Sequence, residues 1–252
     1  MNGCNPSSVD QYEPPQVLIP SPDLPGAPKI PKLAILRPFC ETSLGNINAG
    51  SAFATAFVAE IEGHSPVVLT VMSLLSKANG LSRDASPSEL NSIISGVSFG
   101  SAFGEMDSVL LAEKALDLYD QDKEATDSDD LLAVALPDTA TRRVGTLPLA
   151  DSQPAIGSKI WLSAALTIGA PPSQRQHVAI VKGEDEKGNM TYTFENLEIS
   201  FEGTPGAPML NEEGAVVAVH LFGEKEGGEL IGHGNPTSKF LPDLKSAIER
   251  KP

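Results

Sequence analysis

The 252-residue sequence predicts an all-β fold made of many short strands. It contains 22 glycines and 21 prolines, a proportion that favours frequent turns over long helices. From about residue 33, short apolar or alternating runs recur, and each is bounded by Gly, Pro, Asn or Asp. Closely spaced strands and turns of this kind are typical of a barrel or a sandwich. The length suits one large domain or two small ones.

Charge and cysteine content exclude several classes of protein. There are 18 Lys and Arg against 33 Asp and Glu, so the formal net charge is −15. A field of this sign repels phosphate, and we therefore expect no nucleic-acid partner and no direct binding to an anionic membrane. No apolar run approaches the ~18 residues of a membrane span. Cys4 and Cys40 form one bridge at most and lack the neighbours of a zinc site, so we expect no metal and no cofactor.

Residues 1–32 differ from the rest because they hold eight of the 21 prolines. Proline favours extended backbone, which predicts a linker or a strap along the surface. Gly3-Cys4 followed by a Pro-rich tether resembles the mature end of a bacterial lipoprotein, with lipid on Cys4 as the membrane link. The alternative is an ordinary cysteine near a native start.

Strands are expected, in chain order, over 33–36, 52–59, 67–71, 131–136, 159–164, 177–182, 190–194 and 215–221. Two hairpins are marked by their turns. The first turn is 186–189, which joins the strand at 177–181 to 190–194. The second is 211–214, where Gly214 supplies the positive φ that such a turn needs.

Helical signals are few. Ser86-Pro87-Ser88-Glu89 before a short apolar run predicts a capped helix. A second helix is expected over 242–250, with an apolar stripe at Leu241, Leu244 and Ile248. It has Pro242 and an aspartate near its start and basic residues at its end, which complements the helix dipole.

Four segments in order resemble the trypsin-like, chymotrypsin-fold serine peptidases. Gly50-Ser51-Ala52-Phe53 is similar to an early strand of that family, and 67–75 is similar to its Val-Leu-Thr-Ala-Ala-His-Leu. The segment 130–136 resembles the strand that begins with the catalytic Asp, and 203–210 resembles Gly-Asp-Ser-Gly-Gly-Pro-Val-Leu around the nucleophile. The order and spacing of these matches, rather than any one of them, carry the resemblance, which covers about residues 33–250.

This resemblance implies two six-stranded antiparallel β-barrels with a C-terminal helix and a site between the barrels. The first barrel is expected over 33–143. The second, with the helix, is expected over 144–252. Such proteins are exported, so the resemblance and the Cys4 context together predict a secreted, periplasmic or cell-envelope protein.

The resemblance also assigns the catalytic positions, and two of the three have changed. Ser73 stands at the His position, Asp130 at the Asp position and Pro205 at the Ser position. Serine has no basic nitrogen, and proline has neither a hydroxyl nor a backbone N–H. Gly203 is the remnant donor of the oxyanion hole. Asp130 is interpreted as a remnant that bonds local backbone, with a reused polar site as the alternative.

His220, Thr204 and His233 are the candidate binding residues of the cleft, because the resemblance places them at its wall and rim. His64 and His177 are expected in a surface turn and at the start of a strand, and no pair of histidines has the spacing of a helix-borne zinc site. Residues 120–130 carry six carboxylates, but Ala125 and Leu131 break the pattern of an EF-hand, so a solvated acidic loop is expected.

Three functional hypotheses follow. The first is a non-catalytic homologue of trypsin-like proteases that binds an unidentified protein or peptide, since packing and catalysis use different residues. The second is a serine hydrolase with relocated groups chosen from Ser51, Ser73, Thr204, His220 and Cys40. The third is an envelope module tethered through lipid on Cys4, with the Pro-rich segment as a spacer.

Overall fold

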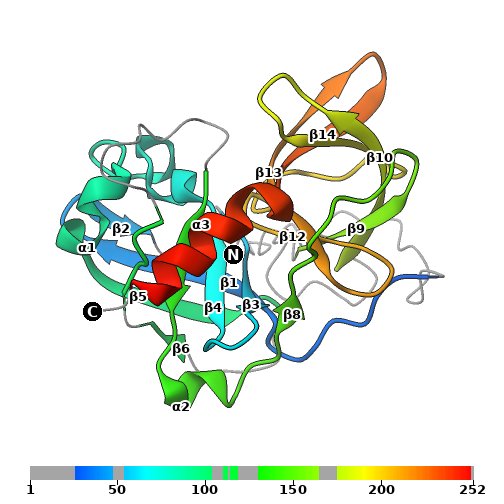
Figure 1. Ribbon diagram of the computed structural model, residues 1–252. Helices are drawn as coiled ribbons and strands as arrows, with labels where there is room; N and C mark the ends of the chain where they lie inside the picture. Colours follow the sequence, from blue (N-terminus) through cyan, green and yellow to red (C-terminus); the bar gives the residue numbers. More distant parts are fainter. Residues whose placement is uncertain are drawn as a thin grey trace, which may run out of the picture.

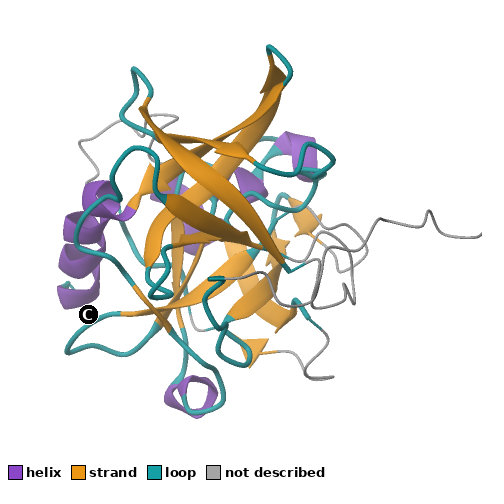
Figure 2. Ribbon diagram, turned by 90° about the vertical axis from the view of Figure 1, so that its right-hand side faces the viewer, coloured by secondary structure: helices purple, strands orange, loops and turns teal. Residues whose placement is uncertain are grey.

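The computed structural model describes residues 26–47, 54–103, 110–112, 114–118, 130–164 and 175–250. Two β-rich lobes lie side by side, and the C-terminal helix lies across them (Figure 1). Strands are the main regular secondary structure of both lobes (Figure 2). The all-β prediction is therefore confirmed. Cys4, the segment 50–53 and the acidic residues 120–129 fall outside the described residues.

The first lobe is one sheet with the strand order β6-β5-β1-β3-β4-β7, to which β2 adds on β1 and β8 adds on β3. An isolated bridge between Ala115 and Val134 joins the chain after β6 to β7, which brings the two ends of the sheet together. This eight-stranded sheet differs from the six-stranded barrel expected, because two short strands pair at its side. Its strands are β1 (Ile35–Thr42), β2 (Gly45–Ile47), β3 (Ala56–Glu60), β4 (Val67–Thr70), β5 (Ile94–Ser101), β6 (Leu110–Leu111), β7 (Leu132–Ala135) and β8 (Leu147–Pro148).

Short helical turns connect these strands. Ser86 and Glu89 form the predicted capping box, with Pro87 in the first turn. The box explains why a helix begins there, because each side chain accepts a backbone N–H that has no partner within the helix. The turns are η1 (Met72–Leu75), η2 (Lys77–Asn79), η3 (Pro87–Glu89), α1 (Leu90–Ile93) and α2 (Asp138–Thr141).

The second lobe is a closed barrel of six antiparallel strands in the order β10-β11-β14-β13-β12-β9. Both predicted hairpins are present, since β10 pairs with β11 and β12 pairs with β13. Gly214 has φ +83° in the second of these turns. The strands are β9 (Lys159–Ser163), β10 (Gln176–Glu184), β11 (Met190–Phe194), β12 (Pro208–Leu210), β13 (Val216–Glu226) and β14 (Glu229–Pro236).

The sequence patterns missed β5 and β14, although each has eight residues. Both strands carry glycines and small polar residues in place of a continuous apolar run. Two of these glycines lie against aromatic rings: a Cβ on Gly232 would lie 2.3 Å from the Tyr192 ring, and one on Gly100 would lie 3.1 Å from the Phe39 ring. Aromatic rings from the neighbouring strands occupy the space beside these glycines. The large apolar residues of this part of the core therefore belong to the neighbouring strands, and β5 and β14 lack the apolar pattern that predicts a strand.

The C-terminal helix α3 (Thr237–Glu249) begins five residues before the start predicted from Pro242. Pro242 lies inside the helix, where the missing N–H removes one backbone bond. The earlier start is favoured by Thr237, whose hydroxyl donates to the Ala150 carbonyl at 2.8 Å, and by burial of Phe240. Phe240 and Leu244 pack into the core of the first lobe, so the helix ties the two lobes together.

The described part of the Pro-rich segment runs along the second barrel. Gly26 lies beside the Trp161 ring, and the Pro28 carbonyl accepts a bond from Gln176 Nε2 at 2.8 Å. The segment then passes Gly145 and enters the first sheet. The contact is close, because a Cβ on Gly145 would lie 2.4 Å from the Pro31 side chain.

Candidate functional site

Ser73 and Asp130 lie side by side. Ser73 is in η1, directly after β4, and Asp130 comes two residues before β7. Strands β4 and β7 are antiparallel neighbours with Thr70 opposite Leu132, so the end of one strand meets the start of the other. Ser73 donates its backbone N–H to Asp130 Oδ1 at 2.6 Å and its hydroxyl to Oδ2 at 2.7 Å. Both carboxylate oxygens therefore bind the same residue.

The turn that contains Pro205 is held to the first lobe by hydrogen bonds. The Thr55 N–H donates to the Pro205 carbonyl at 2.8 Å, and the Thr55 hydroxyl donates to the Gly203 carbonyl at 2.7 Å. The Thr70 hydroxyl in turn donates to the Thr55 carbonyl at 2.8 Å. Thr55 and Thr70 belong to the first lobe, so these bonds fix the position of the turn at the interface.

Gly206 shows how closely the two lobes meet at this turn. It has φ +85°, and a Cβ there would lie 2.2 Å from the Thr55 carbonyl oxygen and 3.1 Å from the Val71 nitrogen. Val71 precedes Ser73 by two residues. The structure therefore brings Ser73, Asp130 and the Pro205 turn to one place between the lobes.

The polar groups of the turn are largely used within the protein. The Gly206 N–H donates to the His220 carbonyl at 2.7 Å. Thr204 is fully buried, and its N–H and hydroxyl both donate to the Phe201 carbonyl, at 3.2 and 2.8 Å. Pro205 has no N–H. Gly203, the remnant donor position, is buried with φ +77°.

His220 is fully buried behind this turn. Its Nδ1 is 2.5 Å from the Tyr192 hydroxyl, and its Nε2 has no hydrogen-bond partner in the described part of the protein. Burial lowers the pKa of His220 to about 3, with repulsion from His233 as a smaller cause. The imidazole is therefore neutral at physiological pH. Neither His220 nor Thr204 presents a polar atom to the surface.

Phe201 fills the space between the turn and strand β13. Its ring stacks on His220 with centroids 5.5 Å apart and lies 5.4 Å from the Phe194 ring. A Cβ on Gly223 would fall 2.2 Å from the Phe201 ring. A side chain of a bound peptide has no room there unless Phe201 moves.

His233, the third candidate binding residue, lies at one end of the second barrel between two carboxylates. Its Nδ1 is 3.2 Å from Asp185 Oδ2, and its Nε2 is 3.3 Å from Glu224 Oε1. Its ring stacks on Phe222, whose exposed fraction is 48%. Although burial raises the pKa of Asp185, hydrogen bonds from Asn189 and His233 outweigh it and hold that pKa below its usual value.

The remaining candidates lie apart from the Ser73–Asp130 pair. His64 is exposed in the turn between β3 and β4, as predicted, and His177 is buried on β10. Cys40 is buried on β1, and burial raises its pKa to about 12, so it is not an activated nucleophile. Ser51 lies outside the described residues.

Two negative findings apply to the described ranges only. No group of three His, Cys, Asp or Glu side chains there could hold a metal ion. No helix there has the length and apolar character needed to cross a membrane.

Sequence reasoning missed Thr55 and Phe201. Thr55 follows the segment 50–53, whose similarity to the family is weak, and a single threonine does not indicate a function. Phe201 is an aromatic residue before a glycine turn, and nothing in the sequence distinguishes it from other core residues. Thr70, by contrast, belongs to the Leu-Thr pair of the resemblance, although its bond to the Thr55 carbonyl was not foreseen.

No protein-family model matches this sequence, and no curated protein matches it either. The similarity appears in solved structures. A thermostable serine protease, AL20, from an extremophilic microorganism is 17% identical, with a TM-score of 0.57 over 87% of this chain and 99% of that one. The protease Anisep from Arthrobacter nicotinovorans is 12% identical, with a TM-score of 0.57 over 88% and 98%. A Glu endopeptidase is 13% identical, with a TM-score of 0.55 over 86% and 91%.

These similarities and the strand arrangement establish the class of fold. The chain has the chymotrypsin fold of trypsin-like serine proteases, with a closed second barrel, an eight-stranded first sheet and a C-terminal helix. Because these sequences are at most 17% identical to this chain, the similarity shows a shared fold and does not show a shared activity.

Proposed function

We propose that this chain is a non-catalytic homologue of trypsin-like serine proteases that binds a protein or peptide between its two lobes. The observation that carries the proposal is the double hydrogen bond between Ser73 and Asp130 beside a turn with proline at the nucleophile position. The chain order and the contact at Gly206 both support the assignment of these positions.

The chemistry of acyl transfer needs groups that this place lacks. A general base must accept the proton of the nucleophile, and Ser73 has no nitrogen that could do so. Pro205 supplies no hydroxyl for attack and no N–H for an oxyanion. Loss of one oxyanion donor alone costs roughly 10²–10³ in rate. The hydroxyl of Thr204 is buried and bonded to the Phe201 carbonyl, which leaves no activated replacement there.

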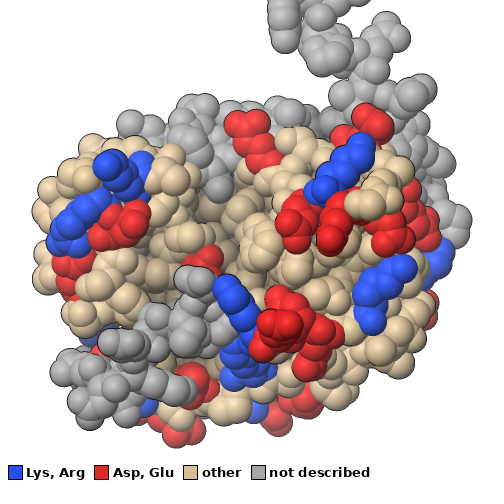
Figure 3. Space-filling view, turned by 90° about the horizontal axis from the view of Figure 1, so that it is seen from above, with Lys and Arg blue, Asp and Glu red and all other residues tan. Residues whose placement is uncertain are grey.

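Binding of a protein or peptide requires an accessible surface but no reactive groups. The surface is hollowed between the two lobes (Figure 3). Phe222 offers an exposed aromatic ring on β13, where it stacks on His233. An extended segment can add to an exposed strand edge without reactive groups. With Phe201 filling the space under the turn, the partner would lie along the surface and insert no deep side chain.

Labelling with a fluorophosphonate probe, followed by intact-mass measurement, tests the proposal, with trypsin as the positive control. We expect no adduct and no casein turnover. An adduct in full stoichiometry that disappears in Ser73→Ala or Thr204→Ala would overturn the proposal, because it would show an activated hydroxyl. Unchanged labelling in both variants would place the hydroxyl elsewhere and would overturn it equally.

A further inference from the structure

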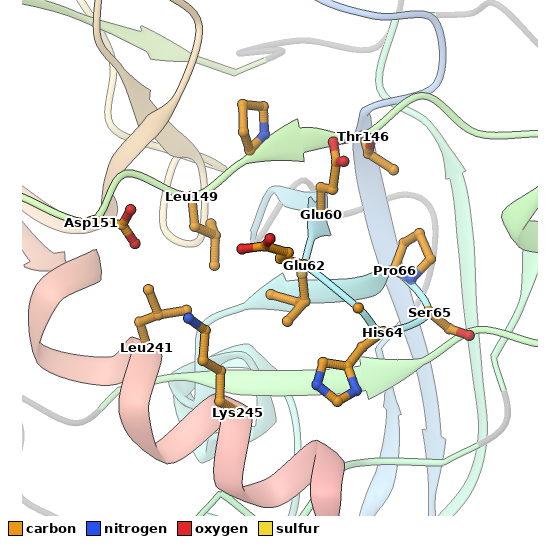
Figure 4. Close-up of a pocket in the computed structure, with 13 residues that line it drawn as sticks. Glu60, Glu62, His64, Ser65, Pro66, Thr146, Leu149, Asp151, Leu241 and Lys245 are labelled. Carbon is orange, nitrogen blue, oxygen red and sulfur yellow. Dashed lines mark hydrogen bonds between the residues drawn. The ribbon is translucent and has the colours of Figure 1, made fainter.

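A cavity of about 830 Å³ beside α3 is lined by exposed carboxylates (Figure 4). They belong to Glu60, Glu62 and Asp151. Exposed carboxylates alone do not identify a ligand, so no function is assigned to this cavity. A feature with defined chemistry lies instead beside Ser73, at Asn79 and the glycine that follows it.

Asn79 is hydrogen-bonded to the segment that contains Ser73. Its Nδ2 donates to the Ser73 carbonyl at 2.9 Å and to the Leu74 carbonyl at 3.2 Å, and it lies 3.4 Å from Ser76 Oγ. The two carbonyls belong to η1, a helix of four residues. The last carbonyls of a helix have no partner within it, so a side-chain amide at this place stabilises η1. Asn79 thus holds Ser73 from one side, and Asp130 holds it from the other.

Asn79 is followed by Gly80, and this order favours a reaction of the asparagine side chain. The backbone nitrogen of the following residue can attack the side-chain carbonyl carbon, and a glycine has no Cβ to hinder the approach. Gly80 is exposed, and a Cβ there would have nothing within 4 Å, so the surroundings also leave room. The sequence holds a second Asn-Gly pair at 2–3, which lies outside the described residues.

The reaction is deamidation through a cyclic imide. A bond forms between the Gly80 nitrogen and Asn79 Cγ, the bond between Cγ and Nδ2 breaks, and Nδ2 leaves as ammonia with the proton of the Gly80 N–H. Water then opens the ring at either of its carbonyls, which leaves aspartate or isoaspartate. Water is the only co-reactant, and nothing is oxidised or reduced.

The turn at 77–80 must open before the ring can close. The Gly80 N–H donates to the Lys77 carbonyl at 3.1 Å, and the Asn79 N–H donates to the Ser76 carbonyl at 3.1 Å. Helix η2 has three residues, and none of them is buried. Short elements with exposed hydrogen bonds open at a small cost in free energy. The rate of deamidation in the folded chain therefore reports how readily this turn opens.

We propose that Asn79 is a deamidation site and that its conversion weakens the link between Ser73 and Asp130. A carboxylate at this position has no N–H to donate, so its oxygens would face the Ser73 and Leu74 carbonyl oxygens. Acceptors that face one another repel, and η1 then loses the contact that holds Ser73 from this side. The proposal rests on these contacts and does not depend on the proposed function.

The first test measures conversion in the full chain. The protein is incubated in mildly alkaline buffer, and peptide mapping by mass spectrometry follows the mass gain and the isoaspartate at 79–80. We expect conversion at least about tenfold slower than in the same chain unfolded in urea, because the turn must open first. In Asn79→Gln the mass gain at this peptide should disappear, since glutamine has to close a larger ring.

The rate also tests whether the turn is coupled to the Ser73–Asp130 link. Asp130→Ala should speed conversion in the folded chain about threefold or more, because η1 is then held less firmly. Glu212→Ala, in the β12–β13 turn, is the control and should leave the rate within about twofold. An unchanged rate in Asp130→Ala would contradict the coupling.

A second test measures the consequence of the modification. Asn79→Asp should lower the Tm by about 2–8 °C, because the donor to both carbonyls is lost. Asn196 is exposed, and its Oδ1 accepts the Glu198 N–H, which an aspartate also accepts. Asn196→Asp therefore adds the same charge and should shift the Tm by less than about 1 °C. Asn79→Asp and Asp130→Ala together should lower the Tm by less than the sum of their separate shifts.

If Asn79→Asp does not fold, Asn79→Ser removes the donor without adding a charge and gives the same comparison. Conversion at 79–80 in the unfolded chain but not in the folded chain would overturn the proposal, because the turn would then never open far enough. Equal Tm shifts in Asn79→Asp and Asn196→Asp would overturn it too, as would shifts of Asn79→Asp and Asp130→Ala that simply add. None of these results bears on the fluorophosphonate test, so the two proposals fail separately.

Discussion

Ser73 and Asp130, 57 residues apart in sequence, are joined by two hydrogen bonds that use the backbone N–H and the hydroxyl of the serine. The carboxylate thus bridges the end of β4 and the start of β7. A hydroxyl can reproduce the orienting contact of an imidazole with this carboxylate but not its basicity. The pair is therefore a structural link between the two strands, at the positions that the resemblance assigns to the catalytic His and Asp.

The structural value of this link can be measured with a double-mutant cycle. Asp130→Ala should lower the free energy of unfolding by about 1–2 kcal/mol, and Ser73→Ala by about 0.5–1.5 kcal/mol. The double variant should lose less than the sum, by about 1 kcal/mol, because the two residues share bonds. Urea denaturation gives all three values. Ser73→Ala combined with Glu212→Ala is the additive control; additivity of the first pair would contradict the observed contact.

The tight contact at Gly206 predicts a large effect of a single methyl group. Gly206→Ala should cost more than about 3 kcal/mol, because the Cβ would overlap the Thr55 carbonyl and φ is also positive. Gly188→Ala is the matched control: its φ is +75° and nothing lies within 4 Å, so only the backbone strain of about 1 kcal/mol remains. Thermal unfolding compares them, and equal losses would show that the turn is not held against the first lobe.

If Gly206→Ala does not fold, Thr55→Val tests the same contact between the turn and the first lobe with a smaller change, and thermal unfolding again measures the loss of stability. It removes the hydroxyl bond to the Gly203 carbonyl and keeps the backbone bond to Pro205. We expect a loss of about 1–2 kcal/mol.

Burial of His220 predicts a pH dependence of stability. Its pKa is lowered to about 3 in the folded state from the ordinary 6.5. Between these values the unfolded chain binds a proton that the folded chain does not, so the free energy of unfolding falls as the pH falls. This residue contributes up to about 1.4 kcal/mol per pH unit in that window. His220→Gln should flatten the slope between about pH 6 and pH 4, as measured by urea denaturation at several pH values.

Restoring the two changed positions tests their assignment directly. Ser73→His/Pro205→Ser should react with the fluorophosphonate probe at least about 10² times faster than the unmodified chain, since it regains base, nucleophile and the second N–H. Each single variant should stay unreactive. Adding Asp130→Asn to the pair should slow labelling again. Labelling of the double variant at a residue other than the new serine would show that the positions are misassigned.

Much of the fold followed from local patterns in the sequence. The turns at 186–189 and 211–214 and the capping box at Ser86 were predicted correctly, because each depends on residues a few positions apart. The early start of α3 and the strands β5 and β14 were missed. Their stability comes from packing against residues far along the chain, such as the ring of Tyr192 over Gly232.

The sequence by itself determined the all-β class and the identity of the residues at the three catalytic positions of the resemblance. Only the tertiary structure decided that Ser73 binds Asp130, that Thr55 reaches Gly203 across 148 residues, and that Phe201 fills the space beneath the turn. The reason is physical. Composition and spacing specify which bonds a residue can make, whereas the folding of both lobes around their cores decides which partner is within reach.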